Sequence, residues 1–197
     1  PSSRRRCQHR SHWMHAQEAQ HGQVDIVGVS CYSSKDLWSW RNEGVVLHGE
    51  ENNLSHDLHK SNVLVRPKVV YNNRTSKYVM WMHIDDANYT KSSISVATSD
   101  SPMGPFTYLY SKRPHNYESR DMTIFKDDDG KAYLIYSSKG NNELHIAQLT
   151  DDYLDVTDGM RRILVARYRE ALTLFKFRDT DYMITLGYTG WAPNTAR

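Results

Sequence analysis

The chain is short of cysteine, of long apolar runs and of concentrated charge. Its 197 residues include two cysteines, Cys7 and Cys31, which could pair but which we expect to be free thiols. No apolar stretch approaches the roughly 20 residues of a membrane-spanning helix, so we expect no membrane span. The basic N-terminal stretch lacks the apolar segment that a secretory signal peptide needs.

The charged side chains are nearly balanced and scattered. Lys and Arg number 25 against 23 Asp and Glu, and the basic residues cluster only at Arg4, Arg5 and Arg6. A nucleic-acid-binding protein gathers basic residues on one face, so we expect no nucleic-acid partner. Ten histidines are present, but those of the N-terminal tail follow no familiar zinc-ligand spacing. We therefore expect no metal site and no cofactor.

Aromatic residues and strand patterns are abundant instead. Thirteen tyrosines and five tryptophans suit β-structure, and aromatic rings also stack on the C–H faces of sugars. From residue 24 onward, short apolar segments alternate with turn residues, and no long amphipathic helix is visible. The clearest hairpin joins 123–125 to 132–136 through a turn that contains Asp129-Gly130. The sequence therefore predicts an all-β fold.

A repeated unit organises these strands. Three hairpins open with an arginine, at Arg66, Arg120 and Arg169, which are 54 and 49 residues apart. After the first two hairpins come a third strand, a polar turn and another apolar piece, and the segment 27–47 repeats this second half. Four short strands every 50 or so residues are typical of a β-propeller blade, although a sandwich without a true repeat is the alternative.

The repeat length sets the domain organisation. The chain holds about three to four blades, and a closed ring needs at least about four, so we expect an incomplete propeller over residues 24–197. Residues 1–23 do not match the repeat. We expect them to form a disordered tail that is rich in basic residues and histidine.

Two carboxylates lie where the innermost strands are expected to begin. Asp121 follows Arg120, and Glu170 follows Arg169. Glycoside hydrolysis uses paired carboxyl groups, one of which must stay protonated to supply the leaving oxygen with a proton. The repeat alone leaves a second interpretation open, in which both carboxylates only pair with neighbouring arginines on a solvated rim.

Several strings along the chain are recognisable. They are VGVSCYSSKDLW (27–38), RPKV (66–69), MWMHIDDANYT (80–90), SRDMTIFKDDDG (119–130), ELHI (143–146), DDYLDVT (151–157) and TGWAPN (189–194). Together they resemble glycoside hydrolase family 43, and most closely its exo-β-1,3-galactanase branch. The resemblance runs from residue 24 to residue 194 and implies a five-bladed propeller, of which this chain would be a fragment.

The resemblance implies a glycosidase that removes terminal β-1,3-linked galactose from galactan or arabinogalactan with inversion. Glu170 matches the general acid, and Asp121 matches the carboxylate that raises the pKa of this acid and orients it. The expected substrate-binding residues are Tyr89, Asn141, Trp191, Asp85 and Arg120. The family further implies a monomer in the secretory pathway, either in the Golgi or outside the cell, with a polysaccharide as its partner.

The sequence departs from the family pattern at the expected site. A glutamate usually precedes the Arg-Pro-Lys string and accepts a hydrogen bond from a sugar hydroxyl, but here Val65 occupies that place. The residue that handles the attacking water is expected beyond Arg197. We therefore expect impaired catalysis in this chain, and the alternative function is a non-catalytic, carbohydrate-binding remnant of a propeller.

Overall fold

The computed structural model describes residues 6–10 and 25–187. These residues form antiparallel strands and a single-turn 3₁₀ helix, η1. In chain order the elements are β1 (Arg6–Arg10), β2 (Gly28–Ser34), β3 (Arg41–His48), β4 (Val63–Asn72), β5 (Lys77–Asp85), β6 (Ser93–Ser99), β7 (Thr107–Lys112), η1 (Pro114–Asn116), β8 (Met122–Lys126), β9 (Ala132–Ser138), β10 (Glu143–Leu149), β11 (Val156–Ile163), β12 (Arg169–Phe177) and β13 (Thr180–Gly187).

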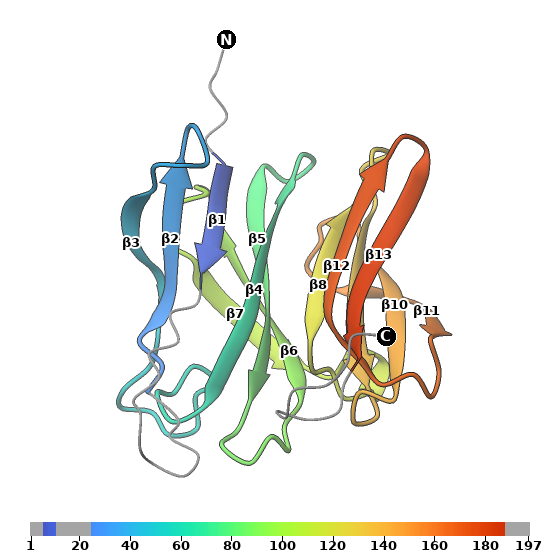
Figure 1. Cartoon of the computed structure of the whole chain (residues 1–197). Helices are drawn as coiled ribbons and strands as arrows, with labels where there is room; N and C mark the ends of the chain where they lie inside the picture. Colours follow the sequence, from blue (N-terminus) through green and yellow to red (C-terminus); the bar gives the residue numbers. More distant parts are fainter. Residues whose placement is uncertain (1–5, 11–24, 188–197) are drawn as a thin grey trace.

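The strands form separate sheets that follow one another in chain order. The strand orders are β1-β2-β3, β4-β5-β6-β7, β8 to β11 in sequence, and β12-β13. Figure 1 shows these sheets beside one another, from the blue strands of the N-terminal part to the red strands of the C-terminal part. Two sheets have the complete four-stranded meander of a blade, which confirms the predicted incomplete propeller.

Turn chemistry at the hairpin tips agrees with the sequence. Between β8 and β9, Gly130 adopts a φ of 84°, which a residue with a Cβ rarely adopts. Its N–H donates to the carbonyl of Asp127 at 3.1 Å, and the N–H of Asp127 donates to the carbonyl of Lys131 at 2.8 Å. These two bonds reverse the chain so that β9 pairs with β8.

The hydrophobic core is divided among the gaps between consecutive sheets. One apolar cluster packs β2 and β3 against β4, β5 and β6, a second packs this sheet against β8 and β9, and a third joins the β8–β11 sheet to β12 and β13. Trp81 belongs to the second cluster. It is fully buried, and its Nε1–H donates to the carbonyl of Tyr153 at 3.0 Å, which ties two sheets together.

The β12–β13 hairpin carries apolar side chains on both of its faces. Leu172, Leu174 and Met183 pack toward the preceding sheet. The opposite face leaves large apolar side chains exposed, namely Phe175, Phe177, Tyr182, Ile184 and Leu186. A strand pair with two apolar faces is typical of a sheet that is covered on both sides.

The N-terminal part adds a strand and a disulfide. Arg6–Arg10 forms β1, which pairs antiparallel with β2, within the tail for which disorder was expected. Cys31 on β2 is disulfide-bonded, and the described residues contain no free cysteine. The expectation of free thiols is therefore wrong. Within the described ranges, no helix is long and apolar enough to cross a membrane.

Candidate active site

The first residues of the inner strands gather at one end of the sheets. β12 points upward in Figure 1, so Arg169 and Glu170 lie at the lower end. Arg66 on β4 and Asp121, just before β8, lie at the same end, because their side chains and the start of β12 contact one another. The loops 86–92 and 139–142, which join later strands of two sheets, also reach this end.

Asp121 bridges three consecutive sheets. Its carboxylate accepts a two-pronged hydrogen bond from Arg66, with Nε 2.9 Å from Oδ1 and Nη2 3.0 Å from Oδ2. Oδ2 also accepts the backbone N–H of Ala171, directly after Glu170, at 2.7 Å. Such charge-assisted bonds fix both the position and the orientation of a carboxylate. Asp121 is therefore held beside Glu170 by groups from β4 and β12.

The environment of Glu170 favours its protonated form. Burial raises the pKa of the Glu170 carboxyl above its ordinary value of 4.5, and the negative charge of Asp121 raises it further. Arg66 acts in the opposite direction. A raised pKa keeps a carboxyl group protonated at higher pH, which is the property that a general acid needs. The structure thus places Asp121 beside Glu170, whose pKa its charge raises, and the catalytic roles of both residues stay predictions.

Matching β-bulges shape the two strands that contribute to this site. The register between β4 and β5 shifts between Val65 and Lys68, and that between β12 and β13 shifts between Glu170 and Thr173. Arg66 and Ala171 adopt left-handed φ angles of 57° and 52° within these irregularities. A bulge redirects side chains and bends the strand, and bulges are common beside active sites.

Two predicted sugar-binding residues offer unused hydrogen-bonding atoms. Asn141 is only 7% exposed, and its carbonyl accepts the N–H of Arg169 at 3.2 Å. The buried Oδ1 atom of Asn141 and the Nε atom of Arg120 have no hydrogen-bond partner among the described residues. This Nε atom lies 3.8 Å from Oε2 of Glu118, an ion pair that is too long for a hydrogen bond. A buried acceptor and donor of this kind need partners, and sugar hydroxyls can serve as both donor and acceptor.

Tyr89 lies on the 86–92 loop at the same end. It is 41% exposed, with a left-handed φ of 57°. Burial raises the pKa of the Tyr89 phenol, the charge of Asp85 raises it further, and Arg120 opposes this effect. The phenol therefore lies within electrostatic range of both charged groups. Tyr89 therefore lies at the same end of the sheets as Glu170, and its contact with a sugar stays a prediction.

Asp85 is buried beneath the 86–92 loop that carries Tyr89. It has 0% exposure, and its Oδ1 accepts the backbone N–H groups of Asp86 and Ser92, both at 3.0 Å. Oδ2 accepts the hydroxyl of Ser92 at 3.2 Å and lies 3.3 Å from Nε2 of His83. Burial alone would raise the pKa of Asp85, but His83 and Ser92 bring it below its ordinary value. These contacts argue against direct sugar binding by Asp85 and favour a role in holding the loop that carries Tyr89.

His83 connects Asp85 to the segment that contains Arg120 and Asp121. Its Nδ1 lies 2.8 Å from the carbonyl oxygen of Ser119. A carbonyl only accepts hydrogen bonds, so Nδ1 must carry the proton. His83 and Asp85 thus link the β5–β6 loop of one sheet to the segment before the first strand of the next.

Sequence reasoning missed three residues of this arrangement as site residues. The pattern marks Arg66 only as the start of a repeat, although its equivalence to Arg120 and Arg169 was a usable signal. Both His83 and Ser92 contact Asp85, which lies nearby in the sequence, but nothing in the residue pattern marks a buried carboxylate that needs these partners. The predicted sugar-binding residue Trp191 lies outside the described residues. Within the described ranges, no group of three or more His, Cys, Asp or Glu residues could hold a metal ion.

Comparison with protein families identifies the chain over nearly its whole length. The model of glycosyl hydrolases family 43 matches residues 13–194. No curated protein sequence is significantly similar to the chain.

Solved structures of family members resemble the chain in fold and in sequence. A GH43 β-1,3-galactosidase, solved with galactodeoxynojirimycin, is 38% identical with a TM-score of 0.84, over 89% of this chain and 65% of that one. The exo-β-1,3-galactanase of Phanerochaete chrysosporium, solved with β-1,3-galactotriose, is 36% identical with a TM-score of 0.80, over 89% of this chain and 40% of that one. The exo-β-1,3-galactanase of Clostridium thermocellum is 40% identical with a TM-score of 0.78, over 85% of this chain and 38% of that one.

The chain spans between 38% and 65% of the length of these structures, so it corresponds to a part of their polypeptides. The expected incomplete five-bladed propeller is confirmed by this likeness together with the sheet topology. The chain therefore belongs to glycosyl hydrolases family 43.

Proposed function

We propose that this chain forms part of a glycosidase that releases galactose from the end of β-1,3-galactan. The observation that carries the proposal is the placement of Asp121 beside Glu170. Glu170 is the general acid, because burial and the adjacent negative charge both raise its pKa. Asp121 keeps its orientation through Arg66 and the N–H of Ala171, and its charge sustains the protonated state of Glu170.

The relatives, together with Tyr89, Asn141 and Arg120 in this chain, support a galactan as the substrate. The exo-acting relatives act on β-1,3-galactan, as their names state. In this chain, Tyr89 offers a ring for the C–H face of a pyranose, while Asn141 and Arg120 offer hydrogen-bonding atoms to its hydroxyls. The mechanism is inversion, in which a second group activates a water molecule on the opposite face of the sugar, and the two groups are about 6.5–9.5 Å apart.

One observation favours a second function. Val65, half-buried directly before Arg66, stands where the family pattern expects a glutamate. Valine cannot accept a hydrogen bond, and a buried sugar hydroxyl without a partner costs about 1–3 kcal/mol. The alternative is a non-catalytic, degenerate remnant of a propeller, in which carbohydrate binding is weakened at this position and turnover is lost.

Galactose release from β-1,3-galactan by the purified chain, beside its Glu170→Gln variant, tests the proposal. We expect slow release by the parent chain, because Val65 weakens substrate binding, and none by the variant. The substitution keeps the size of the side chain and removes the proton that the leaving oxygen needs. Equal release by both proteins would contradict the role of Glu170. No release by either would favour the non-catalytic alternative.

We also propose that the protein resides in the secretory pathway, either in the Golgi or outside the cell. The disulfide at Cys31 supports this location, because disulfides persist in oxidising compartments and are rare in the cytosol. Cell fractionation of the tagged full-length product checks the proposal. Recovery of the protein solely in the cytosol would contradict it.

A further inference from the structure

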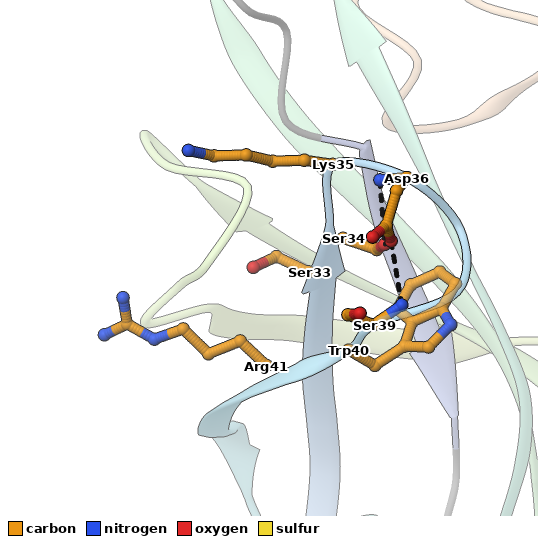
Figure 2. Close-up of a pocket in the computed structure, with 7 residues that line it drawn as sticks. All are labelled: Ser33, Ser34, Lys35, Asp36, Ser39, Trp40 and Arg41. Carbon is orange, nitrogen blue, oxygen red and sulfur yellow. Dashed lines mark hydrogen bonds between the residues drawn. The ribbon is translucent and has the colours of Figure 1, made fainter.

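A cleft of about 470 Å³ lies at the loop that joins β2 to β3, at the end of the sheets opposite the candidate active site. Figure 2 shows the side chains that line it, and the loop that carries them lies at the upper end of Figure 1. A volume of this order is within the range of small-molecule sites. The lining residues are Ser33, Ser34, Lys35, Asp36, Ser39, Trp40 and Arg41.

The loop beside this cleft is held in one conformation by its own side chains. Asp36 Oδ1 accepts the N–H groups of Trp38 and Ser39 at 2.9 and 2.8 Å, and the hydroxyl of Ser34 at 3.0 Å. These bonds lower the pKa of Asp36 to about 2, with the N–H of Ser39 as the largest cause. Leu37 adopts a φ of 65°, a conformation that a bulky residue rarely takes unless neighbouring contacts impose it. The loop is therefore preorganised rather than shaped by a ligand.

The same loop exposes two large aromatic rings. Trp38 is 91% exposed and Trp40 is 39% exposed. The Nε1–H of Trp40 donates to the carbonyl of Leu37 at 3.1 Å, which fixes the ring against its own loop. A fixed indole at a cleft presents a flat apolar surface at little cost in side-chain entropy. Such a surface matches the C–H face of a pyranose.

The charges around the cleft favour a neutral ligand. The carboxylate of Asp36 accepts loop hydrogen bonds, and Arg41 forms an ion pair with Glu43 at 3.6 Å. With Lys35, the cleft region therefore has two positive and two negative side chains, which balance. Exposed donors line the cleft at Ser39, Lys35 and Arg41, and Ser39 lies beside the Trp40 ring whereas Lys35 and Arg41 extend to the other side of the strand (Figure 2). A ligand with hydroxyl groups and an apolar face, but without net charge, complements this surface.

We propose that this cleft is a second carbohydrate-binding site, which takes a neutral pyranose unit of a polysaccharide against Trp40. The choice of galactan as the polysaccharide rests on the proposed function. The cleft and the candidate active site lie at opposite ends of the sheets, so one polymer or two branches of it can occupy both. Two linked contacts raise the apparent affinity for the polymer above that of either contact alone.

Affinity electrophoresis of the whole chain in gels that contain soluble β-1,3-galactan tests this site. We expect the gel to retard the parent chain and to retard Trp40→Ala with about tenfold weaker affinity, the loss expected for one aromatic stacking contact. Arg41→Ala should weaken retardation less. The control is Leu109→Ala, which removes an exposed apolar side chain from β7 and should leave retardation unchanged.

Circular dichroism and a thermal melt establish that each variant folds. If Trp40→Ala does not fold, Arg41→Ala replaces it, because this side chain lines the cleft and is exposed. Equal retardation of the parent and the cleft variants overturns the proposal, and so does the absence of retardation in the parent. Galactose release depends on Glu170 at the other end of the sheets, so that measurement tests the proposed function separately from this cleft.

Discussion

Asp121 shows what a single carboxylate can and cannot reveal from sequence. Its place beside Arg120 left two interpretations open, a catalytic pair or a solvated rim contact with neighbouring arginines. In the structure its partner is Arg66, which lies 55 residues away, together with the N–H of Ala171. The position next to Glu170 was predictable from the repeat. The partner was not, because long-range pairing depends on how blades pack rather than on local spacing.

Val65 is the residue at which a gain of binding can be engineered. Val65→Glu restores an ionised acceptor directly before Arg66, and a hydrogen bond to a charged group contributes about 1.5–3 kcal/mol. Galactose affinity measured by titration calorimetry should therefore rise roughly tenfold or more. Val65→Leu is the matched control, since it changes size without adding an acceptor. Equal affinities of the two variants would contradict the role assigned to this position.

Glu143 is a buried carboxylate with a structural role. It accepts Arg162 Nε at 2.9 Å and His145 Nε2 at 2.8 Å, and Lys139 Nζ lies 3.2 Å away. The hydrogen bond from Arg162 has the largest effect on the pKa of Glu143 and lowers it, and the bonds from His145 and Lys139 lower it further. Burial acts in the opposite direction, and the resulting pKa is about 2, compared with an ordinary value of 4.5. The carboxylate thus stabilises the fold above pH 4.5, and this contribution is lost as the pH falls through about 2.

Glu143→Gln should therefore destabilise the chain most at neutral pH. We expect a loss of about 1–3 kcal/mol in the free energy of unfolding at pH 7, because the buried partners lose a charged acceptor. The difference between parent and variant should shrink as the pH is lowered from 4.5 toward 2. Urea unfolding at several pH values measures it. A difference that is independent of pH would contradict the ionised state of Glu143.

At the scale of single elements, strands and tight turns were predictable and bulges were not. Alternating apolar residues and the Asp129-Gly130 turn located β8 and β9 from sequence. The bulges at Arg66 and Ala171 had no such signal, because neither residue is a glycine and both adopt left-handed φ angles only through their contacts. These irregular positions are the ones that aim side chains into the candidate site.

The loop between β5 and β6 gives a test of how Tyr89 is positioned. Asp85→Asn keeps the shape of the side chain but replaces an acceptor oxygen by a donor, so it cannot satisfy all the groups that Asp85 accepts. Loss of a buried hydrogen bond costs about 1–3 kcal/mol, so the amide of Ser92 should exchange with solvent roughly tenfold faster or more.

Hydrogen exchange followed by NMR measures this change residue by residue. Asp86→Asn is the matched control, because Asp86 accepts the N–H groups of Asn88 and Thr90 but not that of Ser92. Slow exchange of the Ser92 amide in Asp85→Asn would show that the loop does not depend on the buried carboxylate.

For the molecule as a whole, the propeller architecture was predictable because the same unit recurs along the chain. The pairing of Arg6–Arg10 with β2 and the disulfide at Cys31 were not, since neither follows from the repeat. The packing of apolar clusters between consecutive sheets explains why the repeat could be recognised in the sequence. Each sheet must present apolar residues to both neighbours, and each therefore repeats the same pattern.

The exposed face of the β12–β13 hairpin bears on the expectation that the chain is a monomer. Five large apolar side chains on this face leave a patch that favours association in water. We expect concentration-dependent self-association in analytical ultracentrifugation, and Ile184→Lys should reduce it by placing a charge within the patch. Thr107→Lys, an exposed position on β7, is the charge-matched control. Association that Ile184→Lys leaves unchanged would exclude this face as its cause.

The proposed chemistry depends on Glu170 acting as a proton donor beside Asp121. The most direct test is an NMR titration of the Glu170 carboxyl carbon in the parent chain and in Asp121→Asn. We predict a pKa above 4.5 in the parent, and a lower pKa in the variant, because the neighbouring negative charge is gone while Arg66 remains. A pKa of Glu170 at or below 4.5 that does not respond to Asp121→Asn would contradict its role as the proton donor.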